Sequence, residues 1–435
     1  MKMKRIGVGV IGFGTIGAGV VDLLQKNGDE ITRRLGAELE LVKVADLDIE
    51  RDRGVEIERA KLSTDVADVL ENPEVDLVVE LVGGYEPART FVKRALANGK
   101  SVVTANKALL AVHGEEIITA AEEAGCDILF EAAVGGGIPI IRAIREGLAA
   151  NRVRTIYGIL NGTTNYILTE MQEKGESFER VLKEAQRLGY AEADPTFDVE
   201  GVDAAHKLTL LATMAFGRKV SFEDVITEGI SQITPQDIEY AHDFGYEVKL
   251  LGVAKFDGDR VEVRVHPTMI PKNHLLSAVR GVYNAIYVDA DFLGPSLYYG
   301  QGAGREATAS AVVGDLIELA RDRMNGVKGR VAPLSFPLSK MAEAKIKPRG
   351  DIRCRYYVRL TAVDEPGVLS RISGALGKYD ISIESVVQKG RDEGQAVPLV
   401  LMIHEAKEAD IMAALNEIME MKVCLGDPVV IRVER

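Results

Sequence analysis

The 435-residue chain has 53 lysines and arginines against 66 aspartates and glutamates, so its net charge is −13, and 46% of its residues are apolar. Such an acidic chain lacks the basic excess that binding to a phosphate backbone requires, which argues against a nucleic-acid partner. The longest apolar stretch, residues 6–21, is interrupted by glycines and is too short for a membrane-spanning helix, so no membrane segment is expected.

The N-terminus and the cysteines together predict a cytoplasmic protein. The opening sequence MKMKRIGVGV leads directly into a strand-like pattern, without the apolar core and cleavage site of a signal peptide. Cys126, Cys354 and Cys424 have neither metal-ligand spacing nor an even count. We therefore expect neither disulfides nor zinc.

Short apolar runs alternate with helical patterns in the first 130 residues. The runs lie at residues 4–12, 38–46, 75–83, 100–106 and 127–133. They are almost wholly apolar, which is typical of strands buried on both faces by crossover helices. This order predicts an α/β fold with a Rossmann-type, doubly wound parallel sheet, in a dinucleotide-binding domain over residues 1–140.

Strands and helices are grouped instead of alternated in the next stretch. Helix-like segments between residues 161 and 215 precede two strand-like runs, 249–256 and 260–267, joined by the turn-forming tripeptide Asp-Gly-Asp. We predict a central α+β domain for substrate binding, catalysis and dimerisation over residues 141–304. The helical pattern at 305–325 is long enough to pack back onto the first domain and complete it.

The last part of the chain begins with a linker. Residues 326–350 contain three prolines, several basic residues and little periodicity. Residues 351–435 follow with strand, helix, two strands, helix and strand, the second strand being expected at 381–390. This order is the ferredoxin-like βαββαβ arrangement, and its size suits an independent domain.

A glycine-rich turn connects the first strand to the first helix. Gly12, Gly14 and Gly17 form a G-x-G-x-x-G pattern with Phe13, Thr15 and Ile16 between them. In this context the first glycine permits the tight turn, the second lets a pyrophosphate approach the backbone, and the third allows close packing of helix on strand. The helix N-terminus would then bind the pyrophosphate.

The choice between the two nicotinamide dinucleotides stays open. Asp46 ends the second predicted strand, where a carboxylate binds the ribose hydroxyls of NAD and repels the 2′-phosphate of NADP. Arg51 and Arg53 lie just downstream and are suited to accept that phosphate.

A cation held by a carboxylate is the expected partner of hydride transfer, because it stabilises charge on the substrate oxygen. Asp203 and Lys207 stand four residues apart on a predicted helix and share a face, after an acidic stretch that contains Glu192 and Asp198. This cluster is suited to an amino-acid substrate. An exposed ion pair worth about 0.3 to 0.5 kcal/mol is the alternative.

A second basic candidate is Lys107, at the end of a predicted sheet strand, where open α/β sheets bind ligands. A solvated lysine at a helix start is the alternative. His113 and His206 are interpreted as hydrogen-bonded or solvated side chains and not as catalytic ones, and Cys126 as a small core residue.

Six segments in order give the chain a specific resemblance over almost its whole length. They are GFGTIG, TANK, EAAVGGGIPII, NGTTNYIL, GYAEADPTFDVEGVDAAHK and GQGAGREATASAVVGDL. With these the chain resembles the monofunctional homoserine dehydrogenases that carry a C-terminal ACT domain. The resemblance implies NAD- or NADP-dependent interconversion of L-homoserine and L-aspartate 4-semialdehyde, in the biosynthesis of threonine, isoleucine and methionine.

The resemblance also implies roles for individual residues. Lys207 would be the catalytic proton donor, Lys107 a second active-site lysine near the nicotinamide, and Glu192 and Asp203 would bind homoserine. Besides the residues of the glycine turn, the implied dinucleotide-binding set comprises Asp46, Arg53, Lys107, Gly189, Gly302 and Gly304. Ala307 stands where the family usually has proline, which affects the start of the helix more than the glycine contacts.

A monovalent cation and an amino-acid effector are further implications of the resemblance. The cation, expected to be sodium, would be held by the Glu131 carboxylate and backbone carbonyls of Val134, Gly136 and Ile138; oxygen ligands suit such a hard ion. The effector, expected to be threonine, would bind the ACT domain at the turn that contains Asp364, Pro366 and Gly367.

ACT units commonly pair between chains, so a homo-oligomer, dimer or tetramer, is expected. The segment from Lys340 to Lys347 would transmit the regulation to the catalytic domain.

Two other functions compete with this interpretation. A semialdehyde dehydrogenase would need an activated cysteine, and the context of Cys126 does not suit one. A non-catalytic sensor of amino acids and dinucleotides would bind both ligands without turnover.

Overall fold

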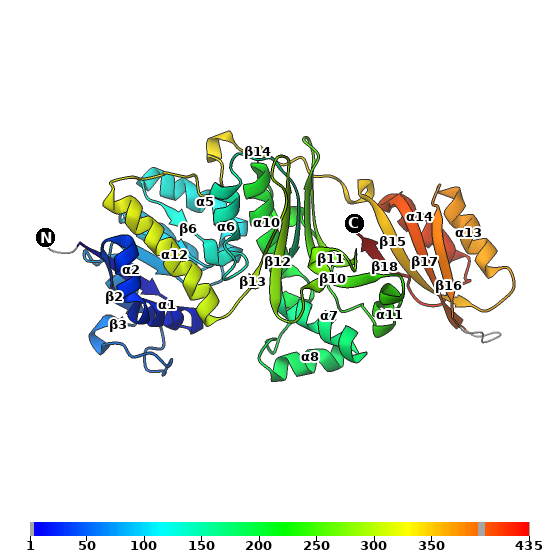
Figure 1. Cartoon of the computed structure of the whole chain (residues 1–435), viewed down its shortest axis with the longest axis horizontal. Helices are drawn as coiled ribbons and strands as arrows, with labels where there is room; N and C mark the ends of the chain where they lie inside the picture. Colours follow the sequence, from blue (N-terminus) through cyan, green and yellow to red (C-terminus); the bar gives the residue numbers. More distant parts are fainter. Residues whose placement is uncertain (1–3, 390–395, 435) are drawn as a thin grey trace.

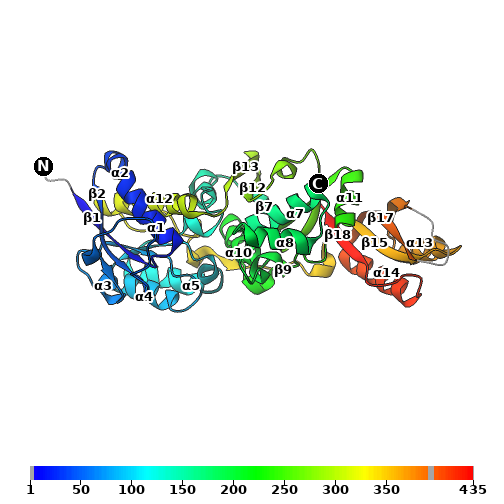
Figure 2. The same ribbon diagram turned by 90° about the horizontal axis from the view of Figure 1, so that it is seen from below.

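The computed structural model describes residues 4–389 and 396–434 of the chain. Three units follow one another along an elongated molecule, with the N-terminus at one end and the C-terminal unit at the other (Figure 1, Figure 2). In these described ranges, no helix combines the length and apolar character that a membrane crossing requires. Cys126, Cys354 and Cys424 are buried free thiols.

The first unit is a parallel sheet in the doubly wound order β3-β2-β1-β4-β5-β6. Its strands are β1 (Arg5–Ile11), β2 (Glu38–Ala45), β3 (Leu62–Ser63), β4 (Leu77–Glu80), β5 (Ser101–Thr104) and β6 (Ile128–Leu129). Its helices are α1 (Thr15–Lys26), α2 (Gly28–Leu35), α3 (Ala67–Leu70), α4 (Ala88–Ala97) and α5 (Lys107–Ala124). The predicted Rossmann-type sheet is confirmed. Strands β1, β4, β5 and β6 are buried from both sides as expected, whereas β2 and β3 are largely half-buried.

Helix α12 (Arg305–Met324) returns from later in the chain to pack beside α1. Its apolar residues Val312, Leu316 and Leu319 join the cluster that contains Val8 and Val20. The two helices approach closely because one contact position on α1 is a glycine: a Cβ at Gly19 would lie 2.8 Å from the carbonyl oxygen of Arg305. This agrees with the prediction that residues 305–325 pack onto the first unit.

The middle unit places helices against one face of a mixed sheet. Its main strands are β7 (Val153–Ile159), β10 (Tyr246–Phe256), β11 (Val261–Pro271), β12 (Tyr283–Ala290) and β13 (Gly294–Gln301), with the short β8 (Arg218–Lys219) and β9 (Ile226–Thr227). Its helices are α6 (Ile140–Arg142), α7 (Gly162–Lys174), α8 (Phe178–Arg187), α9 (Thr196–Val199), α10 (Val202–Phe216) and α11 (Pro235–Asp243). Strands β10 and β11 form the antiparallel pair predicted around the Asp-Gly-Asp turn.

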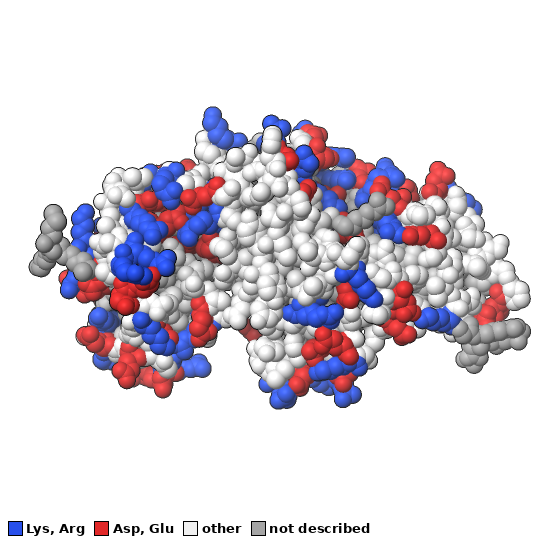
Figure 3. Space-filling view, in the orientation of Figure 1, with Lys and Arg blue, Asp and Glu red and all other residues white. Residues whose placement is uncertain are grey.

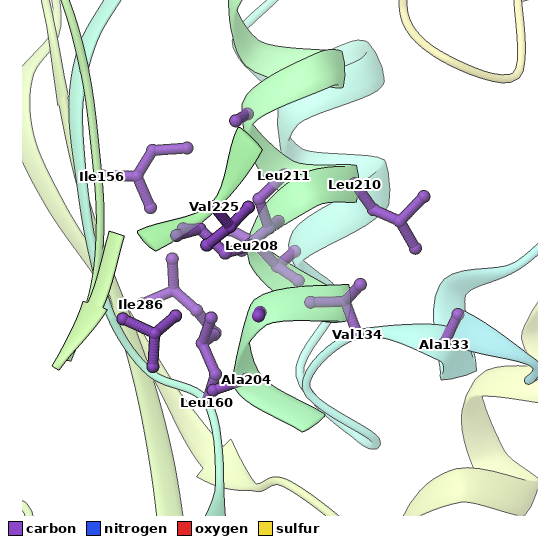
Figure 4. Close-up of a cluster of buried hydrophobic side chains, with 14 of the residues drawn as sticks. Ala133, Val134, Ile156, Leu160, Ala204, Leu208, Leu210, Leu211, Val225 and Ile286 are labelled. Atoms are coloured by element: carbon purple, nitrogen blue, oxygen red, sulfur yellow. The ribbon is translucent and has the colours of Figure 1, made fainter. Parts of the chain in front are cut away.

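Helix α10 lies inside this unit and is buried on nearly all sides. Ala204 and Leu208 lie toward the strands that carry Ile156 and Ile286, whereas Leu210 lies on the side of Val134 (Figure 4). A helix that is apolar all round belongs in a core. The two charged residues that α10 does bury, Asp203 and Lys207, are therefore exceptional.

The C-terminal unit has the predicted ferredoxin-like order. Its elements are β15 (Arg353–Val363), α13 (Val368–Lys378), β16 (Ile383–Gln388), β17 (Ala396–Lys407), α14 (Glu408–Glu420) and β18 (Val429–Val433). Residue 390, the last of the strand expected at 381–390, lies outside the described residues.

The middle and C-terminal sheets are joined edge to edge. Strand β18 pairs with β15 inside its own unit and in parallel with β11 of the middle unit, where Thr268 faces Arg432 and Met269 faces Val433. Within the described residues the result is one sheet of ten strands, in the order β13-β12-β7-β10-β11-β18-β15-β17-β16 with β9 beside β11. The sequence pattern did not predict this continuity.

Buried charges reinforce the same junction. Arg264 on β11 is fully buried and forms ion pairs with Glu262 and with Glu434, at the end of β18. Arg432 pairs with Glu228 of the middle unit at 2.8 Å and with Glu408 of α14. The two units are therefore fixed to each other by charges that have been removed from water.

The segment 326–350, predicted to be a linker, has little regular structure but many contacts. Its strand β14 (Ala342–Glu343) pairs in parallel with β8 of the middle unit. Arg330 forms ion pairs with Glu146 and Glu318 at 3.3 and 3.0 Å. The segment thus contacts both units that precede the C-terminal one.

Candidate active site

The glycine turn has the geometry that its sequence predicts. Gly12 has a φ of +97°, and a Cβ at Gly17 would lie 2.1 Å from the Gly12 carbonyl oxygen. A Cβ at Gly14, in contrast, would meet no atom within 4 Å. Gly14 precedes α1, whose N-terminus has no side-chain cap. Free backbone N–H groups thus face open space, which fits a dinucleotide pyrophosphate.

Two alanine substitutions separate folding from binding at this turn. In Gly17→Ala the new methyl group collides with backbone, so the melting temperature is expected to fall. In Gly14→Ala the methyl group enters the open space, so the melting temperature should hold while the dinucleotide Kd rises about tenfold or more. Thermal unfolding and titration calorimetry measure the two quantities. Equal dinucleotide affinity of Gly14→Ala and the unsubstituted protein would contradict binding at this turn.

Asp46 and Arg53 meet beside the turn, at the end of β2. The Asp46 carboxylate accepts a hydrogen bond of 2.5 Å from the Phe13 backbone N–H. Arg53 lies 3.3 Å from the other carboxylate oxygen, and its guanidinium group lies 5.2 Å from the centre of the Phe13 ring. A carboxylate and a guanidinium group thus lie together where the adenosine ribose of a dinucleotide would bind.

A cavity of about 580 Å³ lies between the first unit and the middle unit. The predicted site residues that line it are Ile16, Lys107, Gly136, Gly189, Asp203, Lys207, Gly302 and Gly304. The residues come from the glycine turn, from the start of α5, from the loops after β6 and after α8, from α10 and from the loop before α12. The fold therefore brings into one cavity positions that are spread over most of the chain.

Asp203 lies between two lysines in this cavity. Its carboxylate is 2.6 Å from the Lys207 ammonium and 3.2 Å from the Lys107 ammonium. Lys207 also donates a hydrogen bond of 2.7 Å to the Leu160 carbonyl. Burial would raise the pKa of Asp203, but the charges of Lys207 and Lys107 outweigh burial and hold this pKa well below its usual range. Asp203 is thus an anion that fixes two cations.

Each of these residues has a local structural reason for its place. Asp203 is in the first turn of α10, where the helix dipole favours an anion, and Lys207 follows one turn later on the same face. Lys107 is the first residue of α5, directly beyond the carboxyl end of β5. The α5 N-terminus is capped by Asn106, whose side chain accepts a hydrogen bond of 3.1 Å from the Leu109 N–H.

Asn161 and Asp198 are polar residues of the cavity; the sequence pattern assigned no role to Asn161, and it predicted Asp198 only as a member of the acidic cluster. The Asn161 side chain donates to Asp203 at 2.9 Å and to Asp198 at 2.7 Å. Burial and the Asp203 charge raise the pKa of Asp198. The signal for both was present in the quoted segments NGTTNYIL and GYAEADPTFDVEGVDAAHK, but it did not distinguish them from their polar neighbours.

Glu192 is exposed and is not among the residues that line the cavity. Its backbone carbonyl accepts a hydrogen bond of 3.0 Å from Gln186. The role in substrate binding that the resemblance implies for Glu192 stays a prediction.

The predicted cation ligands lie in the segment 131–138, of which Gly136 lines the cavity. The buried Glu131 carboxylate accepts backbone N–H groups of Ile141 and Arg142 at 2.9 and 2.8 Å. Gly136 has a φ of +55°, and the Ile138 carbonyl accepts a bond from the Ile140 N–H. Burial raises the pKa of Glu131. In the described part of the chain, no three His, Cys, Asp or Glu side chains group as metal ligands, so carbonyls would have to complete any site here.

The predicted effector residues lie far from the cavity, at the turn between β15 and α13. Gly367 has a φ of +87° and is the cap residue that begins α13, directly after Pro366. Asp364 follows the end of β15.

Models of known protein families match all three units. The homoserine dehydrogenase NAD-binding domain matches residues 12–131, homoserine dehydrogenase itself matches residues 139–317, and the ACT domain matches residues 356–420. The homoserine dehydrogenase of Pseudomonas aeruginosa is 48% identical over 436 residues, 100% of both chains. The chain belongs to the homoserine dehydrogenase family.

Solved homoserine dehydrogenases share the fold. The enzyme from Thiobacillus denitrificans has a TM-score of 0.94 and 48% identity over 99% of both chains. A hyperthermophilic archaeal homoserine dehydrogenase in complex with NADPH has a TM-score of 0.61 and 26% identity, over 77% of this chain and 99% of its own. The family resemblance found in the sequence is confirmed. As a homoserine dehydrogenase the chain is an oxidoreductase with a nicotinamide dinucleotide cofactor, which argues against the non-catalytic sensor. Its ACT domain indicates regulation.

Proposed function

We propose that the chain interconverts L-homoserine and L-aspartate 4-semialdehyde in the biosynthesis of threonine, isoleucine and methionine, with Lys207 as the proton donor to the aldehyde oxygen. The observation that carries this proposal is the group formed by the buried Lys207 and Asp203 with the half-buried Lys107, in a cavity that the glycine turn borders. When bound, the dinucleotide supplies a hydride to the aldehyde carbon or accepts it from the alcohol. The residues of the chain must therefore transfer the proton and stabilise the negative charge on the substrate oxygen.

Lys207 is suited to the proton transfer because its ammonium group is fixed in place. Asp203 and the Leu160 carbonyl hold it from two sides at 2.6 and 2.7 Å. An ammonium group that meets the developing alkoxide stabilises the transition state more than the neutral aldehyde. Lys107 is held by the same Asp203 carboxylate and would orient the substrate near the nicotinamide.

The substrate ammonium needs an anionic partner, and Asp198 is suited to that role beside the implied Glu192. Asp198 lines the cavity, and its carboxylate is held by Asn161. The charge of Asp203 disfavours the Asp198 anion, so a bound ammonium group would relieve this repulsion.

The experiment that tests this proposal compares two aldehydes with the purified chain. Aspartate 4-semialdehyde is expected to oxidise NADPH or NADH rapidly. The comparison aldehyde, 4-oxobutanoate, has the same aldehyde and carboxylate but no α-ammonium group, so its kcat/KM should be lower by about 100-fold or more. Absorbance at 340 nm measures both rates. Equal kcat/KM values for the two aldehydes would exclude recognition of an amino-acid substrate.

Both dinucleotides stay candidates for the cofactor. Asp46 favours the ribose hydroxyls of NAD, and Arg53, 3.3 Å away, offsets its charge and is available to a 2′-phosphate. The archaeal relative in complex with NADPH supports NADP. The same assay, run with NADH and NADPH, measures the preference.

A monovalent cation, sodium in the first place, is proposed at Glu131 with the carbonyls of Val134, Gly136 and Ile138. No lysine or arginine of the described residues forms an ion pair with the buried Glu131 carboxylate, so a cation would balance its charge. The neighbouring donors are neutral carbonyls, which suits a singly charged hard ion. The cation would fix the loop that forms one wall of the cavity.

Threonine is proposed as the effector, bound at the turn of Asp364, Pro366 and Gly367. L-Threonine is expected to lower the turnover of the wild-type chain by about 5-fold or more and not to lower that of Asp364→Ala. Initial rates with and without 5 mM amino acid measure this, and L-valine serves as the control. Equal inhibition of both proteins would show that the effector does not bind at this turn.

A homo-oligomer, dimer or tetramer, is also proposed. The edge strand β13 and the turn before it expose Phe292, Leu293 and Tyr299. Few charged side chains cover this part of the middle unit (Figure 3). An apolar surface of this kind suits a second copy of the chain.

The three buried free cysteines suit the reducing cytoplasm.

A further inference from the structure

Three aromatic rings form a column behind the active-site lysines. The His206 ring lies between Phe222 and Phe197, with ring centres 4.1 and 5.5 Å apart and planes tilted by 9° and 24°. His206 is 1% exposed, and neither ring nitrogen has a hydrogen-bond partner among the described residues. A histidine without polar partners acts here as a flat stacking surface.

The outer end of the column meets Lys107. The Lys107 ammonium lies 6.0 Å from the centre of the Phe197 ring, at the limit of cation–π attraction. In the described part of the chain its one ion pair is with Asp203, at 3.2 Å. An ammonium group on a flexible stem needs more than one contact to keep a direction. Phe197 supplies the second contact.

The column is attached to the elements that carry the cavity residues. Phe197 precedes Asp198 on α9, and His206 precedes Lys207 on α10. Phe222 begins the short 3-10 helix Phe222–Asp224, which follows β8. Strand β8, three residues before Phe222, pairs with β14 of the segment that leads to the ACT domain.

We propose that Phe197 is a positioning residue that holds the Lys107 ammonium in its catalytic direction, and that His206 supports the Phe197 ring from behind as an uncharged partner. The inference rests on the role of Lys107 in the proposed function. Burial lowers the pKa of His206, which agrees with a neutral ring. Because the contact orients a lysine that is proposed to position the substrate, loss of the ring lowers kcat, whereas dinucleotide affinity, which rests mainly on the glycine turn and its neighbours, stays near the wild-type value.

The first test compares Phe197→Leu with Phe197→Tyr. Leucine keeps an apolar side chain but loses the ring, so kcat for semialdehyde reduction is expected to fall about tenfold with the Kd of the dinucleotide unchanged. Tyrosine keeps the ring, so the kcat of Phe197→Tyr should stay within twofold of the wild-type value. The matched control is Phe336→Leu, a ring of similar exposure (41% against 44%) for which no contact with Lys107 is seen in the described residues. Full activity of Phe197→Leu would overturn the inference.

The second test is a double-mutant cycle with Lys107→Met. If the ring acts through Lys107, Phe197→Leu changes kcat about tenfold in the wild-type background and less than twofold in the Lys107→Met background. Equal effects in both backgrounds would show that the ring has only a structural role. This result would overturn the inference but not the proposed role of Lys107. Near-normal kcat of Lys107→Met by itself would overturn the proposed role of Lys107 and this inference with it.

The third test concerns His206. His206→Phe keeps a flat ring without nitrogen atoms and is expected to retain kcat within twofold, because stacking is what the site uses. His206→Ala should reproduce the loss of Phe197→Leu, with thermal unfolding as the measure of its fold. A tenfold lower kcat in a folded His206→Phe would show that the ring nitrogens have a role. It would overturn the inference that His206 acts only as an uncharged stacking partner.

Discussion

Replacing Lys207 by methionine is expected to lower kcat for aspartate semialdehyde reduction by about 10²- to 10⁴-fold. Methionine fills a similar volume but carries no proton and no charge. The buried Asp203 carboxylate keeps Lys107 and Asn161 as partners, at 3.2 and 2.9 Å, so it is not left alone in the protein interior. Steady-state rates at 340 nm give kcat, and calorimetry gives the dinucleotide Kd, which should stay within about twofold of the wild-type value.

The matched control for this substitution is Lys219→Met. Lys219 also belongs to the middle unit and forms an ion pair of 2.6 Å with Glu115, but it does not line the cavity that contains Lys207. Its removal should leave kcat near the wild-type value. If Lys207→Met retained near-normal turnover while folded, Lys207 would not be the proton donor, although the chain would remain a member of the family.

Replacing Glu434 by alanine is expected to lower the free energy of unfolding by about 3 to 5 kcal/mol, because it removes one partner of the fully buried Arg264. Glu434 also accepts a hydrogen bond of 2.9 Å from the Tyr157 hydroxyl and pairs with Lys255 at 2.7 Å. Circular dichroism in urea measures the change. The control Glu405→Ala breaks the exposed pair with Arg353 and should cost about 0 to 1 kcal/mol.

The stability that Glu434 contributes depends on pH in a defined direction. Burial raises its pKa, but the charges of Arg264 and Lys255 outweigh burial and lower the pKa from 4.5 to about 2. Because the folded chain binds this proton less readily than the unfolded chain, the contribution is complete above pH 4.5 and is lost as the pH falls toward 2. The difference between wild type and Glu434→Ala should therefore shrink over this range. An equal difference at pH 7 and pH 3 would contradict the ion pair.

The sequence predicted features that depend on neighbouring residues. The glycine turn and the apolar strands of the first unit follow from patterns that repeat within about ten residues, as does the βαββαβ order of the C-terminal unit. The pairing of Asp203 with Lys207 is equally local, because one helical turn separates them. Whether that pair was exposed or buried could not be decided from spacing.

Tertiary structure decided the contacts between distant segments. Lys107 meets Asp203 only because α5 and α10 pack together, and Asp198 joins the site only because Asn161 bridges it to Asp203. The same holds for the pairing of β18 with β11 and for Arg264 with Glu434.

What the sequence by itself determined is the set of elements, their order and the family, since these arise from local periodicity and from motifs that span a few residues. What only the tertiary structure decided is which charges are removed from water together. Coulomb energy between two side chains depends on their separation and on the dielectric around them, and both are set by the packing of segments far apart in the chain.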